Sequence, residues 1–297
     1  MNVCLDETAP DAPARLRQNG RAAIDEAVDL FRRYDGAANG RIGIAFAPRW
    51  AISCARPTLE AIAHTSAGLN ALVHTHACEQ QDELAMVRDA TGHSSVQYFG
   101  VVGMMSPRLN VAHCVWTDDS DHALMARHDV KVTHCPGSNL KLGSGIAPVT
   151  EMRTRGLNVS LGADAAACNN HLDMFNEMRL SAGLQSIRHS PGTLSARDVL
   201  WMATRGGAAA LGLSDQIGSI EVGKKADLIL LDGLSPHVAP SPDPFSAVVY
   251  AGGADDVRLT MVDGEILVRE GIAVHLDAAE ISADARSAAA ELARRAL

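Results

Sequence analysis

The sequence predicts an α/β fold: a barrel of parallel strands and helices, followed by a small β module. From about residue 20 to residue 215, short apolar runs alternate with longer helical segments. The apolar runs end in polar residues every 20 to 40 residues or so, and a barrel gathers such strand ends into one active site. An open doubly wound sheet would also alternate, but neither a GxGxxG nor a GxxxxGK[ST] loop occurs. The barrel is therefore favoured.

Five apolar runs and five helical segments carry this expectation. Strands are expected at residues 42–47, 71–75, 110–113, 130–133 and 158–162, and helices at residues 22–33, 57–66, 119–128, 172–184 and 196–211. The last helix begins with a capping box, Ser195 to Asp198.

A different pattern follows residue 211. An apolar strand at 228–231 precedes a proline-rich loop, and two alternating runs then flank the Asp263-Gly264 pair, a strong hairpin signal. The alanine-rich residues 278–297 predict a terminal helix. We therefore divide the chain into a barrel domain (1–212), a β module (213–275) and a C-terminal helix (276–297).

Composition limits the classes of partner. The 297 residues are 47% hydrophobic and 21% charged, which excludes disordered and fibrous proteins. The formal charge of −9 argues against nucleic acid and against an anionic membrane surface, so a small-molecule partner fits better. Apolar runs stay well short of a membrane span, and acidic residues stand where a signal peptide carries basic charge. We expect a cytoplasmic protein.

Six cysteines lack the spacing of a disulfide framework or a zinc finger. They are Cys4, Cys54, Cys78, Cys114, Cys135 and Cys168. Some stand beside histidines, so a mixed His/Cys metal site is one interpretation. Adjacent residues of a strand face opposite sides, however, which favours free thiols that pack in the core.

The densest polar cluster is His74-Thr75-His76-Ala77-Cys78-Glu79. In a strand, His74 and His76 share a face, and Glu79 lies just beyond the strand end. This arrangement suits a metal ligand and a proton shuttle. A core histidine with a glutamate that complements a helix dipole is the alternative.

Three further polar residues, His113, His134 and Asp164, also stand at the ends of apolar runs. Burial of a polar group without a partner is costly, and a barrel would bring these strand ends together with His76. The set predicts a divalent metal bound by neutral imidazoles and one carboxylate, with a position left open for water.

Several runs resemble the amidohydrolase superfamily. They are residues 76–79, 112–115, 134–148 and 161–166, together with residues 218–231 and 262–264. Within that superfamily the sequence is similar to the branch of the triazine hydrolases, guanine deaminase and the S-adenosylhomocysteine/methylthioadenosine deaminases. The similarity covers essentially the whole chain from about residue 41 onward, and it implies a (β/α)8 TIM-type barrel.

The resemblance also implies roles for the residues. His76 corresponds to the fifth-strand metal ligand, and Asp164 to the eighth-strand ligand that also takes a proton from the attacking water. Glu79 would pass a proton to the leaving nitrogen. His113 would hold the water or polarise the substrate, and in some members it also approaches the metal.

Three residues are candidates for the substrate pocket. His134 and Asn139 would line or brace it. Trp50 follows an expected strand end and is a candidate for substrate contact, with packing as the alternative. His74 has no assigned role.

One feature of the family is missing. The first barrel strand of the family ends in His-x-His, which supplies two metal ligands, but no histidine precedes His64 here. Residues 2–7 resemble the tail of an early strand, so we expect an N-terminally incomplete barrel. A truncated gene product, a fragment and a homo-oligomer that completes the barrel are alternatives.

The function implied is hydrolysis of a non-peptide C–N bond: deamination of an amino-substituted N-heterocycle of the purine base or nucleoside type. Zn²⁺ or Fe²⁺ would activate the water. Dechlorination or dealkylamination of a triazine is an alternative, although Glu79 favours deamination because chloride leaves without a proton. A non-catalytic remnant that binds metal weakly is the third possibility.

Overall fold

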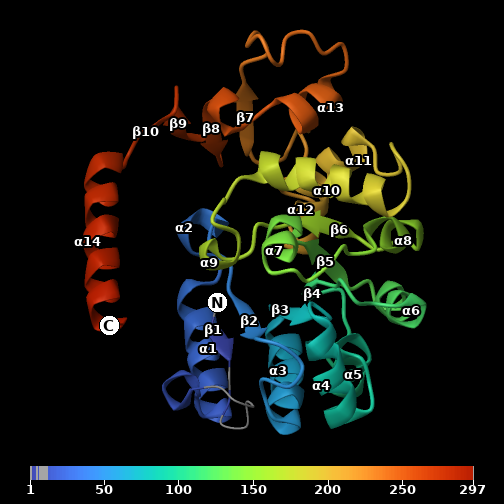
Figure 1. The fold of residues 1–297 in the computed structure, drawn as a ribbon. Coiled ribbons are helices and arrows are strands. Elements are labelled where there is room, and N and C mark those ends of the chain that lie inside the picture. Colours follow the sequence, from blue (N-terminus) through green and yellow to red (C-terminus); the bar gives the residue numbers. More distant parts are fainter. Residues whose placement is uncertain (1, 5, 7–12, 297) are drawn as a thin grey trace.

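A computed structural model describes residues 2–4, 6 and 13–296. Its main sheet has six strands in sequence order, each parallel to the next (Figure 1). These strands are β1 (Asn2–Cys4), β2 (Ala45–Pro48), β3 (Leu72–Ala77), β4 (Leu109–His113), β5 (Lys131–His134) and β6 (Val159–Leu161). Within the described residues, β1 and β6 form the two edges.

Helices connect successive strands, as parallel pairing requires. The α-helices up to the end of the barrel region are α1 (Gly20–Tyr34), α2 (Ala37–Gly40), α3 (Arg56–Leu69), α4 (Gln81–Thr91), α5 (Ser95–Val101), α6 (Asp119–Arg127), α7 (Pro136–Lys141), α8 (Val149–Thr154), α9 (Ala166–Asn169), α10 (Met174–Arg188), α11 (Ala196–Trp201) and α12 (Gly207–Ala210). A π-helical turn, Met202–Gly206, joins α11 to α12. The helix expected at 196–211 is therefore one continuous helical segment.

The two faces of the parallel sheet differ in polarity. Val111, Val132 and Val159 stand side by side across three strands, and each is at most 1% exposed. The opposite face carries polar residues, because successive side chains alternate. There the Thr133 hydroxyl donates to Asn110 Oδ1 at 2.9 Å and lies 3.1 Å from Ser160 Oγ. The apolar face packs in the hydrophobic core, and Asn110, Thr133 and Ser160 on the polar face line a pocket.

A second, antiparallel sheet follows. Its strands β7 (Leu228–Leu231), β8 (Val257–Val262), β9 (Glu265–Arg269) and β10 (Ile272–Ala273) stand in the order β10-β9-β8-β7. Asp263 and Gly264 join β8 to β9 with φ of +52° and +81°, the left-handed conformation that a tight hairpin needs. The short helix α13 (Pro244–Ser246), a π-helical turn (Ala247–Ala251) and a 3₁₀ turn (Ala254–Asp256) lie between β7 and β8.

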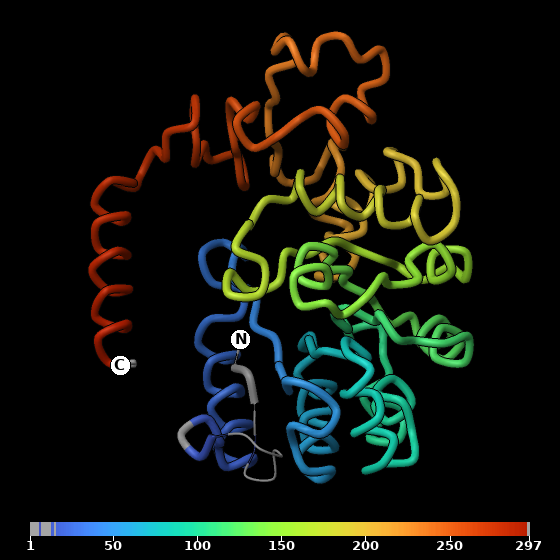
Figure 2. Tube along the Cα trace, in the orientation of Figure 1, coloured from blue at the N-terminus to red at the C-terminus, as the bar shows by residue number. Residues whose placement is uncertain are grey.

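The terminal helix α14 (Ala278–Ala296) stands apart from the sheets in the view of Figure 2. Its described side chains are almost all exposed. No helix in the described part of the chain is long and apolar enough to cross a membrane.

The expected α/β architecture, with a parallel sheet and a small antiparallel sheet, is confirmed. The expected strands are found with shifted ends; the first begins at Ala45 rather than at residue 42. Short helices such as α7 and α8 were not expected, since six residues are too few for a clear helical period. The domain limits at 212 and 275 stay a prediction.

Candidate metal centre

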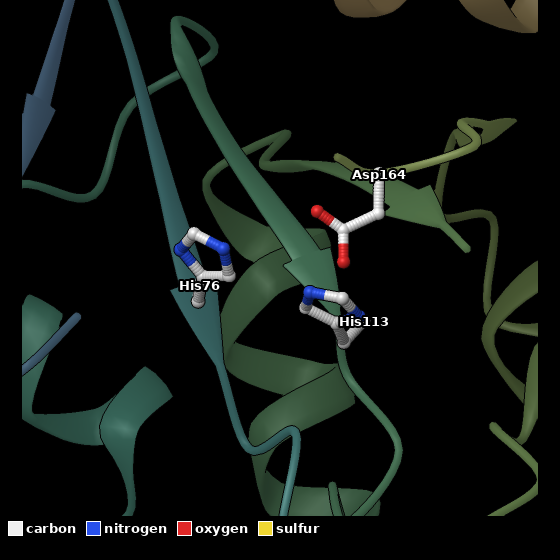
Figure 3. A group of neighbouring side chains, drawn as sticks. All are labelled: His76, His113 and Asp164. Carbon is white, nitrogen blue, oxygen red and sulfur yellow. The ribbon is translucent and has the colours of Figure 1, made fainter. Parts of the chain in front are cut away.

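Three strand ends bring His76, His113 and Asp164 together. Their ligand atoms all lie within 4.8 Å of one another. His76 lies on β3, His113 ends β4, and Asp164 follows β6 by three residues. Figure 3 shows the three side chains converging on a common space. The two imidazole rings are stacked, with centroids 5.3 Å apart and planes 20° from parallel.

Unusual backbone conformations direct two of these side chains. Strand alternation would place His113 on the same face as Val111, away from His76. His113 has φ +70° and Asp164 has φ +60°, values that non-glycine residues rarely adopt and that cluster at functional sites. The left-handed turn at His113 breaks the alternation, so its ring stacks on that of His76.

Hydrogen bonds fix the orientation of both rings. His76 Nδ1 lies 2.6 Å from the carbonyl oxygen of Arg49. Because a carbonyl only accepts, Nδ1 carries the proton and Nε2 keeps a free lone pair. His113 Nδ1 lies 2.9 Å from Asn139 Oδ1, which leaves its Nε2 free in the same way. Metal-binding histidines in proteins are usually held by such contacts to the second ring nitrogen.

The protonation of the group suits a divalent metal. Burial, helped by the neighbouring His113, lowers the pKa of His76. Burial alone would raise the pKa of Asp164, but hydrogen bonds from Ser138 Oγ and the Ala165 amide, together with the two histidines, lower it. A neutral His76 imidazole and an ionised Asp164 carboxylate therefore coexist at neutral pH, and an N/O donor set of this kind is one that zinc prefers.

Glu79 lies at the edge of this group. Its Oε2 is 3.8 Å from His113 Nε2, and its side chain is 21% exposed. The buried Glu83 side chain accepts the amide hydrogens of Cys78 and Glu79, at 3.1 and 2.6 Å. The first turn of α4 thus fixes the backbone from which Glu79 projects.

The remaining candidates are placed as follows. His134 is 1% exposed, burial lowers its pKa to about 3, and neither ring nitrogen has a hydrogen-bond partner within the described residues. Asn139 contacts His113. Trp50 is partly buried against the hydrophobic core, so its role as a substrate contact stays a prediction. His74 lines a pocket together with Leu72 and Leu211.

Cys54, Cys78, Cys114 and Cys135 are buried free thiols, and Cys168 is half-buried. The side chain of Cys4 lies outside the described residues. Burial raises the pKa of Cys78 to about 12, so its thiol stays protonated. The expectation that the cysteines are free thiols packed in the core agrees with the burial of these four side chains.

Sequence reasoning missed two contacts of the centre. Ser138 Oγ donates to Asp164 Oδ2 at 2.6 Å, and the Arg49 carbonyl holds His76. Ser138 lies within the run 134–148 that carried the resemblance, so a signal for it existed. A backbone carbonyl leaves no signal in a sequence.

Two curated proteins that are similar to this chain are deaminases. The chain is 38% identical over 276 residues to a 5-methylthioadenosine/S-adenosylhomocysteine deaminase of Pelotomaculum thermopropionicum, covering 93% of this chain and 64% of the relative. It is 39% identical over 272 residues to a 5'-deoxyadenosine deaminase of Methanothermobacter thermautotrophicus, covering 91% and 63%. The chain thus spans less than two thirds of these relatives.

A solved deaminase structure is also similar to this chain. The crystal structure of an adenosine deaminase from Xanthomonas campestris with bound zinc superposes with a TM-score of 0.90 at 31% identity, covering 96% of this chain and 64% of that one. The sequence profile of the amidohydrolase family matches residues 1–267. The predicted resemblance is confirmed, and the chain belongs to the amidohydrolase family.

Proposed function

We propose that this chain carries the catalytic centre of a metal-dependent hydrolase that removes an amino group from a purine nucleoside. The observation that carries the proposal is the position of Glu79 beside His113, 3.8 Å from its Nε2, next to the group of His76, His113 and Asp164. The two carboxyl groups have different surroundings: Asp164 accepts from Ser138 Oγ and the Ala165 amide, whereas Glu79 lies beside His113. Such a pair suits acid and base work at a single carbon.

The residues divide the work between them. His76 and Asp164 would hold a divalent metal, Zn²⁺ in the first place, with His113 beside it. When bound, the metal makes water acidic enough to attack at neutral pH. Asp164 would accept a proton from the attacking water as the water oxygen bonds to the ring carbon that carries the amino group. Glu79 delivers a proton to the nitrogen, the C–N bond breaks, and ammonia leaves.

The substrate class follows from the named relatives. 5-Methylthioadenosine, S-adenosylhomocysteine and 5'-deoxyadenosine are the substrates in the names of the two relatives. All three are adenosines altered at the 5′ position and share the 6-amino group. Glu79 also supports deamination over displacement of chloride from a triazine, because chloride needs no proton to leave.

Glu79→Gln tests the proposal. The amide keeps the size of the side chain but has no acidic proton to donate to the leaving nitrogen. We therefore expect the zinc-loaded chain to lose about 10²- to 10⁴-fold in kcat. Ammonia release from the three adenosines measures kcat, and elemental analysis checks that the variant still binds zinc. Glu280→Gln, on the exposed helix α14, is the matched control.

Two results would contradict the proposal. One is undiminished ammonia release by Glu79→Gln. The other is a zinc-loaded chain that releases chloride from a chlorinated triazine but no ammonia from any adenosine.

A further inference from the structure

A buried glutamate on α10 connects the loops on either side of Asp164. The Glu177 side chain is 0% exposed. Its Oε2 accepts the amide hydrogen of Gly137 at 2.8 Å, and its Oε1 accepts from Asn169 Nδ2 at 2.8 Å. Both partners are N–H donors, so each of the two Glu177 carboxyl oxygens accepts one hydrogen bond.

Each of the two partners is connected to Asp164 through one neighbouring residue. Gly137 precedes Ser138, whose hydroxyl donates to Asp164 Oδ2 at 2.6 Å. Asn169 Nδ2 also donates to the carbonyl oxygen of Ala163, the residue before Asp164, at 2.8 Å. Glu177 thereby holds both the backbone that carries Asp164 and the donor that orients its carboxylate.

The conformation of Asp164 explains why such support is needed. Its φ of +60° is unfavourable for a non-glycine residue. A conformation of this kind persists only where the surroundings hold it in place. The contacts to Ala163 and to Asp164 Oδ2 act on the two sides of this residue.

The side chains of Glu177 and Asn169 approach the backbone of Gly137 closely. A Cβ atom at this position would lie 2.5 Å from Glu177 Oε1 and 2.6 Å from Asn169 Nδ2. A residue without a side chain is therefore required here because Glu177 and Asn169 approach the backbone closely. Backbone conformation does not require the glycine, because its φ lies outside the left-handed region.

We propose that Glu177 is a positioning residue that fixes the Asp164 carboxylate for metal binding and proton transfer. The inference rests on the proposed function for the role of Asp164. Glu177 acts on Asp164 through Gly137 and Ser138 on one side and through Asn169 and Ala163 on the other.

Glu177→Gln tests this without changing the size of the side chain. Glutamine offers one acceptor oxygen and would turn its NH₂ group against one of the two donors. In the metal-free chain, we expect faster hydrogen exchange in residues 163–169 than in the unaltered chain. Asp256→Asn is the matched control, because Asp256 is also buried and accepts from the Gly253 amide at 2.9 Å and contacts His237 at 3.0 Å.

A second readout concerns the metal itself. We expect Glu177→Gln to weaken zinc binding about 10- to 100-fold, as the loss of supporting contacts around a metal ligand typically does. The visible absorption of the Co²⁺-loaded chain should change as well, because it reports ligand geometry. Asp256→Asn should leave both measurements unchanged even where it lowers the melting temperature.

Gly137→Ala is the second variant, in case Glu177→Gln does not fold. It keeps the carboxylate but pushes Glu177 and Asn169 away from the loop, and we expect the same changes in exchange and zinc affinity. Unchanged exchange in residues 163–169 in a folded variant would overturn the inference, whatever the activity of the chain. Undiminished ammonia release by Glu79→Gln would instead overturn the proposed function alone.

Discussion

The parallel and antiparallel sheets of this molecule differ in what surrounds them. Every residue of β4 is buried, whereas no residue of β7, β8, β9 or β10 is. Ile229 and Leu230, in the middle of β7, are 49% and 58% exposed. Both sheets have regular backbone pairing. The parallel sheet supplies fully buried residues to the core, whereas the described part of the antiparallel sheet contacts it through partly buried residues such as Leu231 and Val257.

This difference bears on function. A side chain keeps a fixed position only when its neighbours hold it, and a reactive group must be held to within a fraction of an ångström. The parallel sheet ends in residues supported by buried partners, such as Glu83 and Glu177. The antiparallel sheet has exposed ion pairs instead, such as Arg41 with Glu265 at 2.9 Å, and contacts of that kind contribute little.

The largest expected difference between the two regions concerns two aspartates with the same backbone conformation. Asp164 has φ +60° and Asp263, in the hairpin turn, has φ +52°. Asparagine tolerates this conformation as well as aspartate does. Asp164→Asn should weaken zinc binding by more than about 10²-fold, because a ligand counts for more than its supporting contacts, and Asp263→Asn should not change it.

Zinc titration of the two variants, followed by elemental analysis after dialysis, measures this difference. Equal zinc affinity of both variants would mean that Asp164 is not a ligand.

A smaller difference is expected in stability. Leu109 on β4 is 0% exposed, and Leu230 on β7 is 58% exposed. Leu109→Ala removes buried methyl groups and leaves a cavity, so the free energy of unfolding should fall by about 2–5 kcal/mol. Leu230→Ala should cost less than about 1 kcal/mol.

Urea denaturation of each variant gives both values. A cost at Leu230 as large as that at Leu109 would show that the antiparallel sheet is packed in solution against something that covers β7.

The sequence predicted the strands of the parallel sheet well, because their apolar runs are bounded by turns and helices. It also predicted that His76, His113 and Asp164 lie near one another, since the carboxyl ends of parallel strands share one edge. It could not predict the left-handed turns at His113 and Asp164. Hydrophobic periodicity carries no information on the sign of φ at a residue with a side chain.

His74 shows the limit of the same reasoning. It shares a face with His76, as strand alternation requires, but two residues along a strand separate side chains by roughly 6.6 Å. It is outside the group of His76, His113 and Asp164 and lines a pocket with Leu72 and Leu211. The role of Glu177 also could not be predicted from the sequence. It depends on the packing of α10 against two loops whose contacting residues lie 40 and 8 residues away in the chain.

The smallest expected difference concerns pH. His122 on α6 is 2% exposed, and burial lowers its pKa, helped by Arg155 and opposed by Asp119, Glu151 and Asp118. An unfolded histidine takes up its proton near pH 6.5, so below that pH the unfolded chain binds more protons than the folded one. The free energy of unfolding therefore falls as pH drops from about 6.5 toward the folded pKa, by at most about 1.4 kcal/mol per pH unit for this group.

His122→Gln should remove this part of the slope, because its amide can still contact the Thr117 hydroxyl, which lies 2.9 Å from His122 Nε2, but does not titrate. The measurement is urea denaturation at several pH values between 7.5 and 5. His275→Gln, at a side chain that is 60% exposed in the antiparallel region, is the control. If both variants keep the original slope, burial of His122 does not contribute to acid sensitivity, and other buried groups of the parallel region, such as His134, must account for it.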